Sequence, residues 1–138
     1  MPSIFSRIIA GEIPCYKIAE NTHCIAFLDI NPLKEGHALI VPKKECDDLF
    51  DLDNETYNHL LSFSKKVAIA TKAVIPCKRI SVAVLGFEVP HAHIHLIPIN
   101  NEGEANFRNQ KIKFTKEEFE ATRQKISQSF VGLFPSSE

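Results

Sequence analysis

Several features that would direct the interpretation of a sequence are missing from this chain. It contains no tryptophan and a single methionine, and no apolar run approaches the roughly 20 residues that cross a bilayer. The N-terminal sequence MPSIFSRIIAGEIP becomes polar too early to contain the apolar core of a signal peptide. We therefore expect a cytoplasmic protein that does not act at a membrane.

An excess of charge of one sign is missing as well. Sixteen basic and 17 acidic residues give a net charge of −1 at pH 7, so no broad positive surface for nucleic acid is expected. The hydrophobic share of 44% and the charged share of 24% are ordinary for a globular protein. The length of 138 residues suits one domain with a hydrophobic core, and we expect a single domain over residues 1–138.

Cysteine pairs at metal-binding spacing are also absent. The four cysteines are Cys15, Cys24, Cys46 and Cys77, and none belongs to a C-x-x-C pair or lies near a histidine at zinc-finger spacing. In a cytosolic protein an even number of cysteines does not imply disulfides. We expect reduced and mostly buried thiols.

Short apolar runs and turn residues predict strands and helices in alternation. The expected helices cover 4–10, about 54–75 after an N-cap at Asp53, and 116 to about 130 after a capping box at Thr115–Glu118. The expected strands are 15–20, 23–29, 36–42, 80–86 and 91–99, and residues 101–113 are expected to form a loop. Hairpin-length connections favour an α+β fold: a five-stranded antiparallel sheet with one long helix and shorter terminal helices to one side. A C-terminal extension of about 101–138 ends in a helix.

The sequence HAHIHLIPI, residues 91–99, has an unusual concentration of histidine. His91, His93 and His95 occupy every second position, so on a strand they share one face. Ala92, Ile94 and Leu96 would then pack behind them. Three imidazoles in a row present donors and acceptors that titrate near neutral pH.

Three interpretations of this row remain open from the residues alone. The histidines could be structural, which would require a separate satisfied environment for each of them. They could bind a metal with further ligands from Glu88, Asp29 or His37, leaving an open position for water. They could also act in covalent catalysis, because a neutral imidazole is a good nucleophile and flanking imidazoles can bind oxyanions and move protons.

Family resemblance favours the last interpretation. HAHIHLIP resembles the signature of the histidine triad (HIT) superfamily, in which His-x-His-x-His alternates with apolar residues. IFSRIIAGEIP is similar to the family's N-terminal helix, and AFLDINPLKEGHALIVPKK is similar to the block that follows it. These segments cover most of residues 4–99 in the family's order.

The resemblance implies a nucleotide hydrolase or nucleotidyl transferase, often a homodimer whose sheets join. By this resemblance His93 attacks the α-phosphorus and forms a nucleotidyl-histidine, while His91 and His95 hold phosphoryl oxygens and assist proton transfer. The implied substrates are purine nucleoside phosphoramidates or related nucleotides, without a metal or other cofactor. Two alternatives stay open: a metal-dependent hydrolase that uses the same row, and a nucleotide-binding sensor or adaptor with slow turnover.

The resemblance also assigns binding residues. Asp29 matches the acid that accepts the ribose hydroxyls, and His37 matches a histidine beside the triad. The apolar positions that sandwich the base are Phe5, Ile8, Phe27 and Ile30. The alternative for these residues is an ordinary place in the core or at the end of a strand.

The segment before the triad departs from the family. Phe87 and Glu88 stand where an amide and a hydroxyl are usual, and an Asn-x-Gly stretch is missing. We expect Glu88 to alter the choice of leaving group, either as a protonated acid or by favouring a cationic amine. Some branches hold a structural zinc with an N-terminal Cys-x-x-Cys, whereas here Ser3 and Ser6 occupy those positions.

Overall fold

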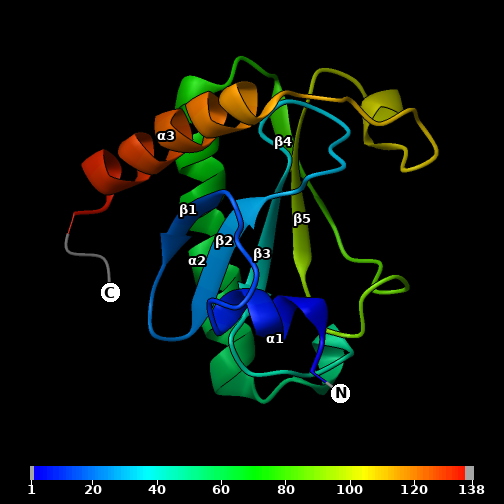
Figure 1. Cartoon of the computed structure of the whole chain (residues 1–138), viewed down its shortest axis with the longest axis vertical. Coiled ribbons are helices and arrows are strands. Elements are labelled where there is room, and N and C mark those ends of the chain that lie inside the picture. The colour runs from blue at the N-terminus through cyan, green and yellow to red at the C-terminus, as the bar shows by residue number, and fades with distance from the viewer. Residues whose placement is uncertain (1, 136–138) are drawn as a thin grey trace.

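The structure, a computed structural model that describes residues 2–135, is a mixed arrangement of strands and helices (Figure 1). Its helices are α1 (Ile4–Ile9), α2 (Asn54–Val74) and α3 (Lys116–Leu133), with short 3-10 turns η1 (Leu49–Asp51) and η2 (Glu102–Ala105). Its strands are β1 (Lys17–Glu20), β2 (Cys24–Leu28), β3 (Ala38–Pro42), β4 (Arg79–Ala83) and β5 (Ile94–Ile99).

The strands form one antiparallel sheet in the order β1-β2-β3-β5-β4. The predicted α+β class and the five-stranded antiparallel sheet are therefore confirmed. Strand β5 lies between β3 and β4, where Leu39 is opposite His95 and His95 is opposite Ala83. The end of the histidine row thus enters the sheet at an interior strand.

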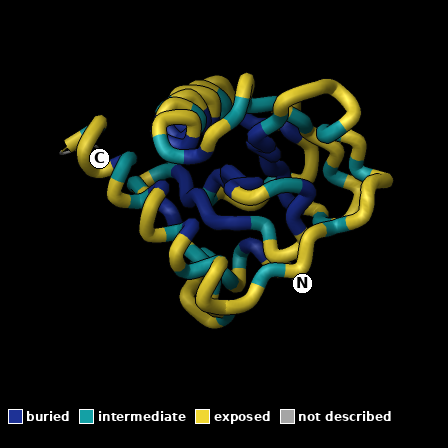
Figure 2. The backbone as a smooth tube through the Cα atoms, turned by 90° about the horizontal axis from the view of Figure 1, so that it is seen from above, coloured by how far each residue is buried: buried dark blue, intermediate teal, exposed yellow. Residues whose placement is uncertain are grey.

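Alternating side chains divide the central strands between two apolar clusters. On one face Ala26 of β2 and Ile40 of β3 join the main core with α2 and α3. On the other face Phe27 and Leu39 pack with Phe5 of α1. Because both faces are covered, β2 and β3 are buried along their whole length, as the dark central strands of Figure 2 show.

The helices therefore do not all lie on one side of the sheet, which corrects the expected arrangement. In Figure 1, α1 lies in front of the sheet and α2 behind it. The N-terminal helix is short, and its Phe5 is only 6% exposed, so it covers the opposite face through few side chains. A helix was predicted here over 4–10, and the structure has one over Ile4–Ile9, but local sequence signals do not indicate which face of a sheet a helix covers.

Helix ends follow the predicted capping chemistry closely. Asp53 accepts a hydrogen bond from the Thr56 N–H at the start of α2. Thr115 and Glu118 form the reciprocal bonds of a capping box at the start of α3. The last helix then continues to Leu133, beyond the predicted end.

Strand boundaries were predicted less well. The strand expected over 91–99 begins only at Ile94, so His91 and His93 lie in the segment that leads into β5. The strand expected over 80–86 ends at Ala83, and the loop expected over 101–113 contains the turn η2. Ala92, Ile94 and Leu96 are buried in the main core, as predicted.

All four cysteines are free, as expected for reduced thiols, although only Cys24 is fully buried. Among residues 2–135, no helix is long and apolar enough to cross a membrane.

Candidate active site

A cavity of about 620 Å³ opens on the face of the sheet that α1 covers. Its wall includes most of the residues predicted from the sequence: Phe5, Ile8, Phe27, Asp29, Ile30, His37, Glu88, His93 and His95. The structure thus brings together side chains from α1, the end of β2, the start of β3 and β5. His91 is the one predicted site residue that does not line the cavity.

His93 presents one unprotonated nitrogen to this cavity. Its Nδ1 lies 2.7 Å from the carbonyl oxygen of His91, and because a carbonyl only accepts, Nδ1 carries the proton. Burial lowers the pKa of His93, although the carbonyl of His91 and the charges of Asp29 and Glu88 oppose that shift. The neutral ring therefore has its lone pair on Nε2, the form that a nucleophile requires.

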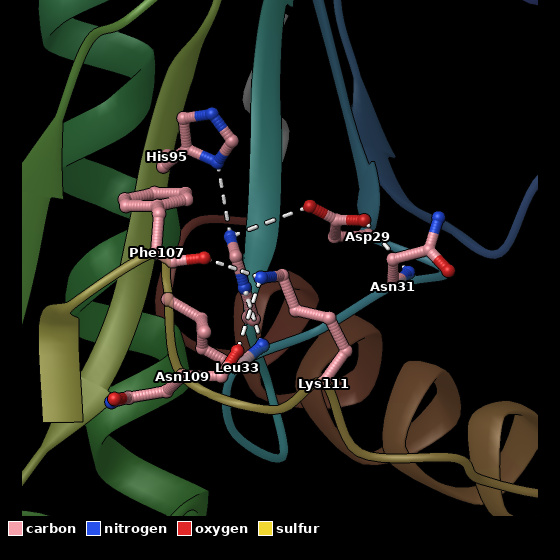
Figure 3. Close-up of polar contacts among 8 residues, drawn as sticks. Asp29, Asn31, Leu33, His95, Phe107, Asn109 and Lys111 are labelled. Atoms are coloured by element: carbon pink, nitrogen blue, oxygen red, sulfur yellow. Dashed lines mark hydrogen bonds and ion pairs between the residues drawn. The ribbon is translucent and has the colours of Figure 1, made fainter.

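The proton positions on His37 and His95 follow from a backbone contact. The Leu33 N–H donates to His37 Nδ1 at 3.0 Å, so the neutral His37 ring carries its proton on Nε2 (Figure 3). That Nε2 lies 3.0 Å from His95 Nδ1, which accepts the hydrogen bond. His95 is left with its own proton on Nε2, so it can donate a hydrogen bond to a ligand.

Both rings are neutral near pH 7. Burial lowers the pKa of His37 to about 4, with Asp29 opposing the shift and Lys111 assisting it. Burial also lowers the pKa of His95 to about 3, helped by its histidine neighbours. Because neither ring is charged, each can have one donor and one acceptor nitrogen, as the hydrogen bonds require.

Asp29 follows β2 and faces the same cavity. Its Oδ2 lies 3.5 Å from His37 Nε2, and its Oδ1 accepts the Asn31 N–H at 2.8 Å. Its side chain is 18% exposed, so a ligand can reach the remaining lone pairs of the carboxylate. Gly36 helps to form this corner: it adopts a φ of +88°, and a Cβ there would lie 3.2 Å from Ile75 Cγ1.

Asp29, His37 and His95 are close enough to suggest a metal site, since one ligand atom from each lies within 4.8 Å of the others. The hydrogen bond from Leu33 opposes this assignment. Because it occupies the lone pair of His37 Nδ1, the proton of the neutral ring is on Nε2, the atom that would have to bind the ion. A metal-bound histidine normally donates its other N–H instead. This donor set therefore does not fit a metal.

The positions that are predicted to contact a base form an apolar wall beside His93. Phe5 and Phe27 meet edge to face with their ring centroids 5.7 Å apart, and the Phe5 ring also lies 4.9 Å from that of His93. Ile8 is partly buried beside them, whereas Ile30 is 66% exposed at the rim. An apolar wall beside a nucleophile suits a flat ring such as a nucleobase.

Residues 86–89, the segment before the triad that departs from the expected family pattern, lie at the mouth of the cavity. Glu88 is exposed and lines the cavity. Its negative charge partly opposes the lowering of the His93 pKa by burial. Phe87 also lines the cavity, yet its side chain is 94% exposed. The turn before them is made at Gly86, which adopts a φ of +76°.

Two residues that the sequence interpretation missed come from the polar segment 101–113. The ring of Phe107 lies 4.8 Å from that of His95 and covers it edge to face. Lys111 lines the cavity and donates to the carbonyl oxygens of Phe107 and Asn109 at 2.5 and 3.2 Å (Figure 3). A lone aromatic within a polar stretch was the only available signal for this contact.

The fold and the neutral imidazole row define a class of proteins, and comparison with known proteins identifies it. The HIT domain matches residues 10–102 of this chain. The chain therefore belongs to the HIT family, the histidine triad superfamily.

Individual relatives agree with this assignment. An uncharacterized HIT-like protein of Borreliella burgdorferi is 36% identical over 132 residues, which cover 90% of this chain and 95% of the relative. An adenosine 5′-monophosphoramidase of Schizosaccharomyces pombe is 39% identical over 106 residues, covering 74% of this chain and 77% of the relative. A crystal structure of a HIT-like protein from Bartonella henselae is 32% identical with a TM-score of 0.80, covering 92% and 95% of the two chains.

Proposed function

We propose that this protein is a nucleotide hydrolase or nucleotidyl transferase that acts at the α-phosphate through a covalent intermediate on His93. The observation that carries the proposal is the hydrogen bond from His93 Nδ1 to the His91 carbonyl, because it leaves Nε2 unprotonated in the cavity wall. The naming of the yeast relative as an adenosine 5′-monophosphoramidase supports the same reaction class.

In the first step the lone pair of His93 Nε2 attacks phosphorus, and the bond from phosphorus to the leaving group breaks. The leaving nitrogen or oxygen takes the electron pair of that bond and a proton from water at the mouth of the cavity, while the His95 Nε2–H donates a hydrogen bond to it. The Nε2–H of His37 donates to His95 Nδ1 and so keeps the proton of the neutral His95 ring on Nε2.

In the second step water attacks the nucleotidyl-histidine, and His93 Nε2 recovers its lone pair. The attacking water gives up its proton to solvent, and His37 and His95 keep their starting tautomers. A nucleophilic acceptor other than water would turn the same step into nucleotidyl transfer. Division into two displacements lowers the barrier of each one.

The residues that line the cavity support a purine nucleoside phosphoramidate or a related ribonucleotide as substrate. Asp29 would accept hydrogen bonds from the ribose hydroxyls, and Phe5 and Phe27 would contact the base. Glu88 lies exposed at the mouth, where it would favour a leaving group that is a cationic amine. Replacement of Glu88 by serine should then shift relative rates toward dinucleotide substrates and away from phosphoramidates; unchanged relative rates would remove Glu88 from this role.

The decisive experiment is mass spectrometry of the chelator-treated protein after brief incubation with adenosine phosphoramidate. We expect a nucleotidyl adduct on the wild-type protein and none on His93→Gly. His59→Gly is the matched control, because His59 is a partly exposed histidine that does not line the cavity.

Two outcomes would contradict the proposal. Turnover that disappears with chelator and returns with zinc or manganese would indicate a metal-dependent hydrolase. Nucleotide binding without adduct or turnover would indicate a sensor or adaptor.

We also propose that the protein forms a homodimer by joining sheets at β4. This strand is at one end of the sheet, and its Val82 is 63% exposed. The adjoining loop exposes Leu85 and Phe87. An unpaired edge next to exposed apolar side chains is suited to pairing with a second copy.

A further inference from the structure

The N-terminal end of α1 meets the first histidine of the triad. Ser3 is the N-cap of this helix, and its Oγ accepts the Ser6 N–H at 3.0 Å. The same Oγ lies 2.8 Å from Nδ1 of His91, which is 88 residues away in the sequence. Ser3 is 5% exposed and His91 is 0% exposed, so water does not compete for this contact.

The hydrogen bonds around His91 determine which of its nitrogens carries the proton. Nε2 lies 2.8 Å from the carbonyl oxygen of Pro42, so Nε2 donates. In a neutral ring Nδ1 is then an acceptor, and the Ser3 hydroxyl is the donor that it meets.

The carboxylate of Glu45 holds Ser3 in place. Glu45 accepts hydrogen bonds from the Ser3 N–H at 3.0 Å and from the Ser6 hydroxyl. These bonds leave the Ser3 hydroxyl proton free to point at His91. The Ser6 hydroxyl lies farther from His91 Nδ1, at 3.5 Å, and its own proton is directed to Glu45.

His91 in turn positions the nucleophile through its backbone. The carbonyl oxygen that orients His93 belongs to His91, at 2.7 Å from His93 Nδ1. The His91 ring is held at both nitrogens, and the peptide that carries its carbonyl is held by the Ala92 N–H bond to the Cys46 carbonyl at 2.7 Å, so side chain and carbonyl are fixed together. The ring of Phe5, two residues after Ser3 on the same helix, packs against both histidines, with centroid distances of 5.9 Å to His91 and 4.9 Å to His93.

We infer that Ser3 is a positioning residue: its hydroxyl fixes the Nε2–H tautomer of His91 and so aims the His93 nucleophile. His91 acts here from behind the cavity wall and not by contact with the phosphoryl group. The catalytic part of this inference depends on the proposed function, whereas the tautomer of His91 does not. The inference assigns the N-terminus of α1 a role beyond capping.

Two isosteric substitutions separate capping from hydrogen-bond donation. Ser3→Asp and Ser3→Asn impose the same steric burden, and both residues are good N-caps. An asparagine amide can accept from Ser6 and donate to His91 Nδ1, whereas an aspartate only accepts. Nδ1 of His91 would then face a carboxylate, and the ring must take up a second proton or change its tautomer.

The first measurement is NMR of the protein with ¹⁵N-labelled histidine, which distinguishes protonated from unprotonated ring nitrogens. We expect the Nε2–H tautomer of His91 in the wild type and in Ser3→Asn, and a change at Nδ1 in Ser3→Asp. The second measurement is steady-state kinetics with adenosine phosphoramidate. We expect Ser3→Asp to lower kcat about tenfold with little change in KM, while Ser3→Asn stays within about twofold.

A control for lost capping is available at α3. Thr115→Ala removes the N-cap of α3, and Thr115 does not line the cavity, so the substitution should lower thermal stability without changing kcat. Equal kcat and equal His91 spectra in the aspartate and asparagine variants would overturn the inference, as would an Nδ1–H tautomer in the wild type. If no substrate is turned over, the NMR comparison still decides the tautomer, so failure of the proposed function would be recognised separately.

Discussion

At the scale of single residues, the site depends on which nitrogen of each histidine carries the proton. Backbone groups make that choice for His37, through the Leu33 N–H, and for His93, through the His91 carbonyl. For His91 the Pro42 carbonyl and the Ser3 hydroxyl act together. Because burial keeps His37, His93 and His95 neutral, each of them has one donor and one acceptor. The triad is therefore chemically asymmetric although its sequence is symmetric.

Substitution of His37 tests the hydrogen bond that sets the tautomer of His95. His37→Gln keeps an N–H that can donate to His95 Nδ1, whereas His37→Leu has a similar volume and no donor. We expect kcat to fall about tenfold more in the leucine variant than in the glutamine variant, because His95 loses its preferred tautomer. Equal kcat values in the two variants, measured with both proteins shown to be folded, would exclude a catalytic role for the hydrogen bond from His37 to His95.

Substitution of Asp29 tests the ribose contact. Asp29→Asn keeps the shape of the side chain but removes the charge of the carboxylate that we propose accepts hydrogen bonds from the ribose hydroxyls. We expect kcat/KM for ribonucleotides to fall about tenfold, while the value for 2′-deoxyribonucleotides changes much less. If both substrate types lose activity equally, the carboxylate acts through its 3.5 Å contact with His37 and not through the sugar.

The residues of the site were partly predictable. The two-residue spacing of the histidines placed His93 and His95 in one wall, and motif resemblance added Asp29 and His37. Neither signal could show that His91 turns away to bond with Ser3 and Pro42, because those contacts span 88 and 49 residues. Tertiary contacts of that range leave no local pattern.

At the scale of elements, the segment 101–113 is the part whose contribution to the site was least evident from the sequence. Its composition is polar, yet it is tied down by the Ile112 N–H bond to the Pro32 carbonyl at 2.9 Å and by the Lys34–Glu104 ion pair at 3.0 Å. With these two contacts holding the segment, Phe107 packs against His95. The capping box of α3 was recognisable because it is local, whereas this contact depends on anchors in a distant loop.

Removal of the Phe107 ring tests whether the segment 101–113 keeps water away from His95. Phe107→Ala should admit water beside His95 and raise the depressed pKa of that ring toward its ordinary value of 6.5. Activity should then begin to fall at a higher pH on the acidic side of the rate profile. Phe50→Ala is the matched control, since Phe50 is 80% exposed on η1 and does not line the cavity. A pH profile of Phe107→Ala that coincides with that of the wild type would show that the ring only fills space.

At the scale of the whole molecule, the buried histidines couple stability to pH. The pKa values of His37 and His95 fall from 6.5 in the unfolded chain to about 4 and about 3 in the fold. Below pH 6.5 His37 and His95 bind protons in the unfolded state but not in the folded state, so acid favours unfolding. Their contribution to stability is complete above pH 6.5 and is lost as the pH falls toward those folded values.

Urea denaturation between pH 7.5 and about pH 5 measures this linkage. The free energy of unfolding should decrease with falling pH by up to about 1.4 kcal/mol per pH unit for each neutral buried histidine. His37→Gln should lower the slope by about one such contribution. An unchanged slope in that variant would mean that His37 takes up its proton equally in both states.

The two ends of the sheet differ in whether they are open to a second copy. At one end β1 has charged Lys17 and Glu20, and Arg123 of α3 donates to the Lys17 carbonyl at 3.2 Å. Charges and a covering side chain block pairing there. At the other end β4 exposes Val82, so a two-fold axis beside β4 would join the sheets and cover that apolar side chain.

Val82→Arg should therefore convert a dimer into a monomer, because two like charges would face each other across the axis in a low-dielectric interface. Phe50→Arg places the same charge on an exposed aromatic outside the sheet and should leave the dimer intact. Sedimentation velocity over a range of concentrations distinguishes the two masses. Since the cavity wall continues from β4 through Leu85 and Phe87, the monomeric variant should also lose affinity for nucleotide while its unfolding remains cooperative. A wild-type protein that sediments as a monomer throughout would exclude the joined sheet.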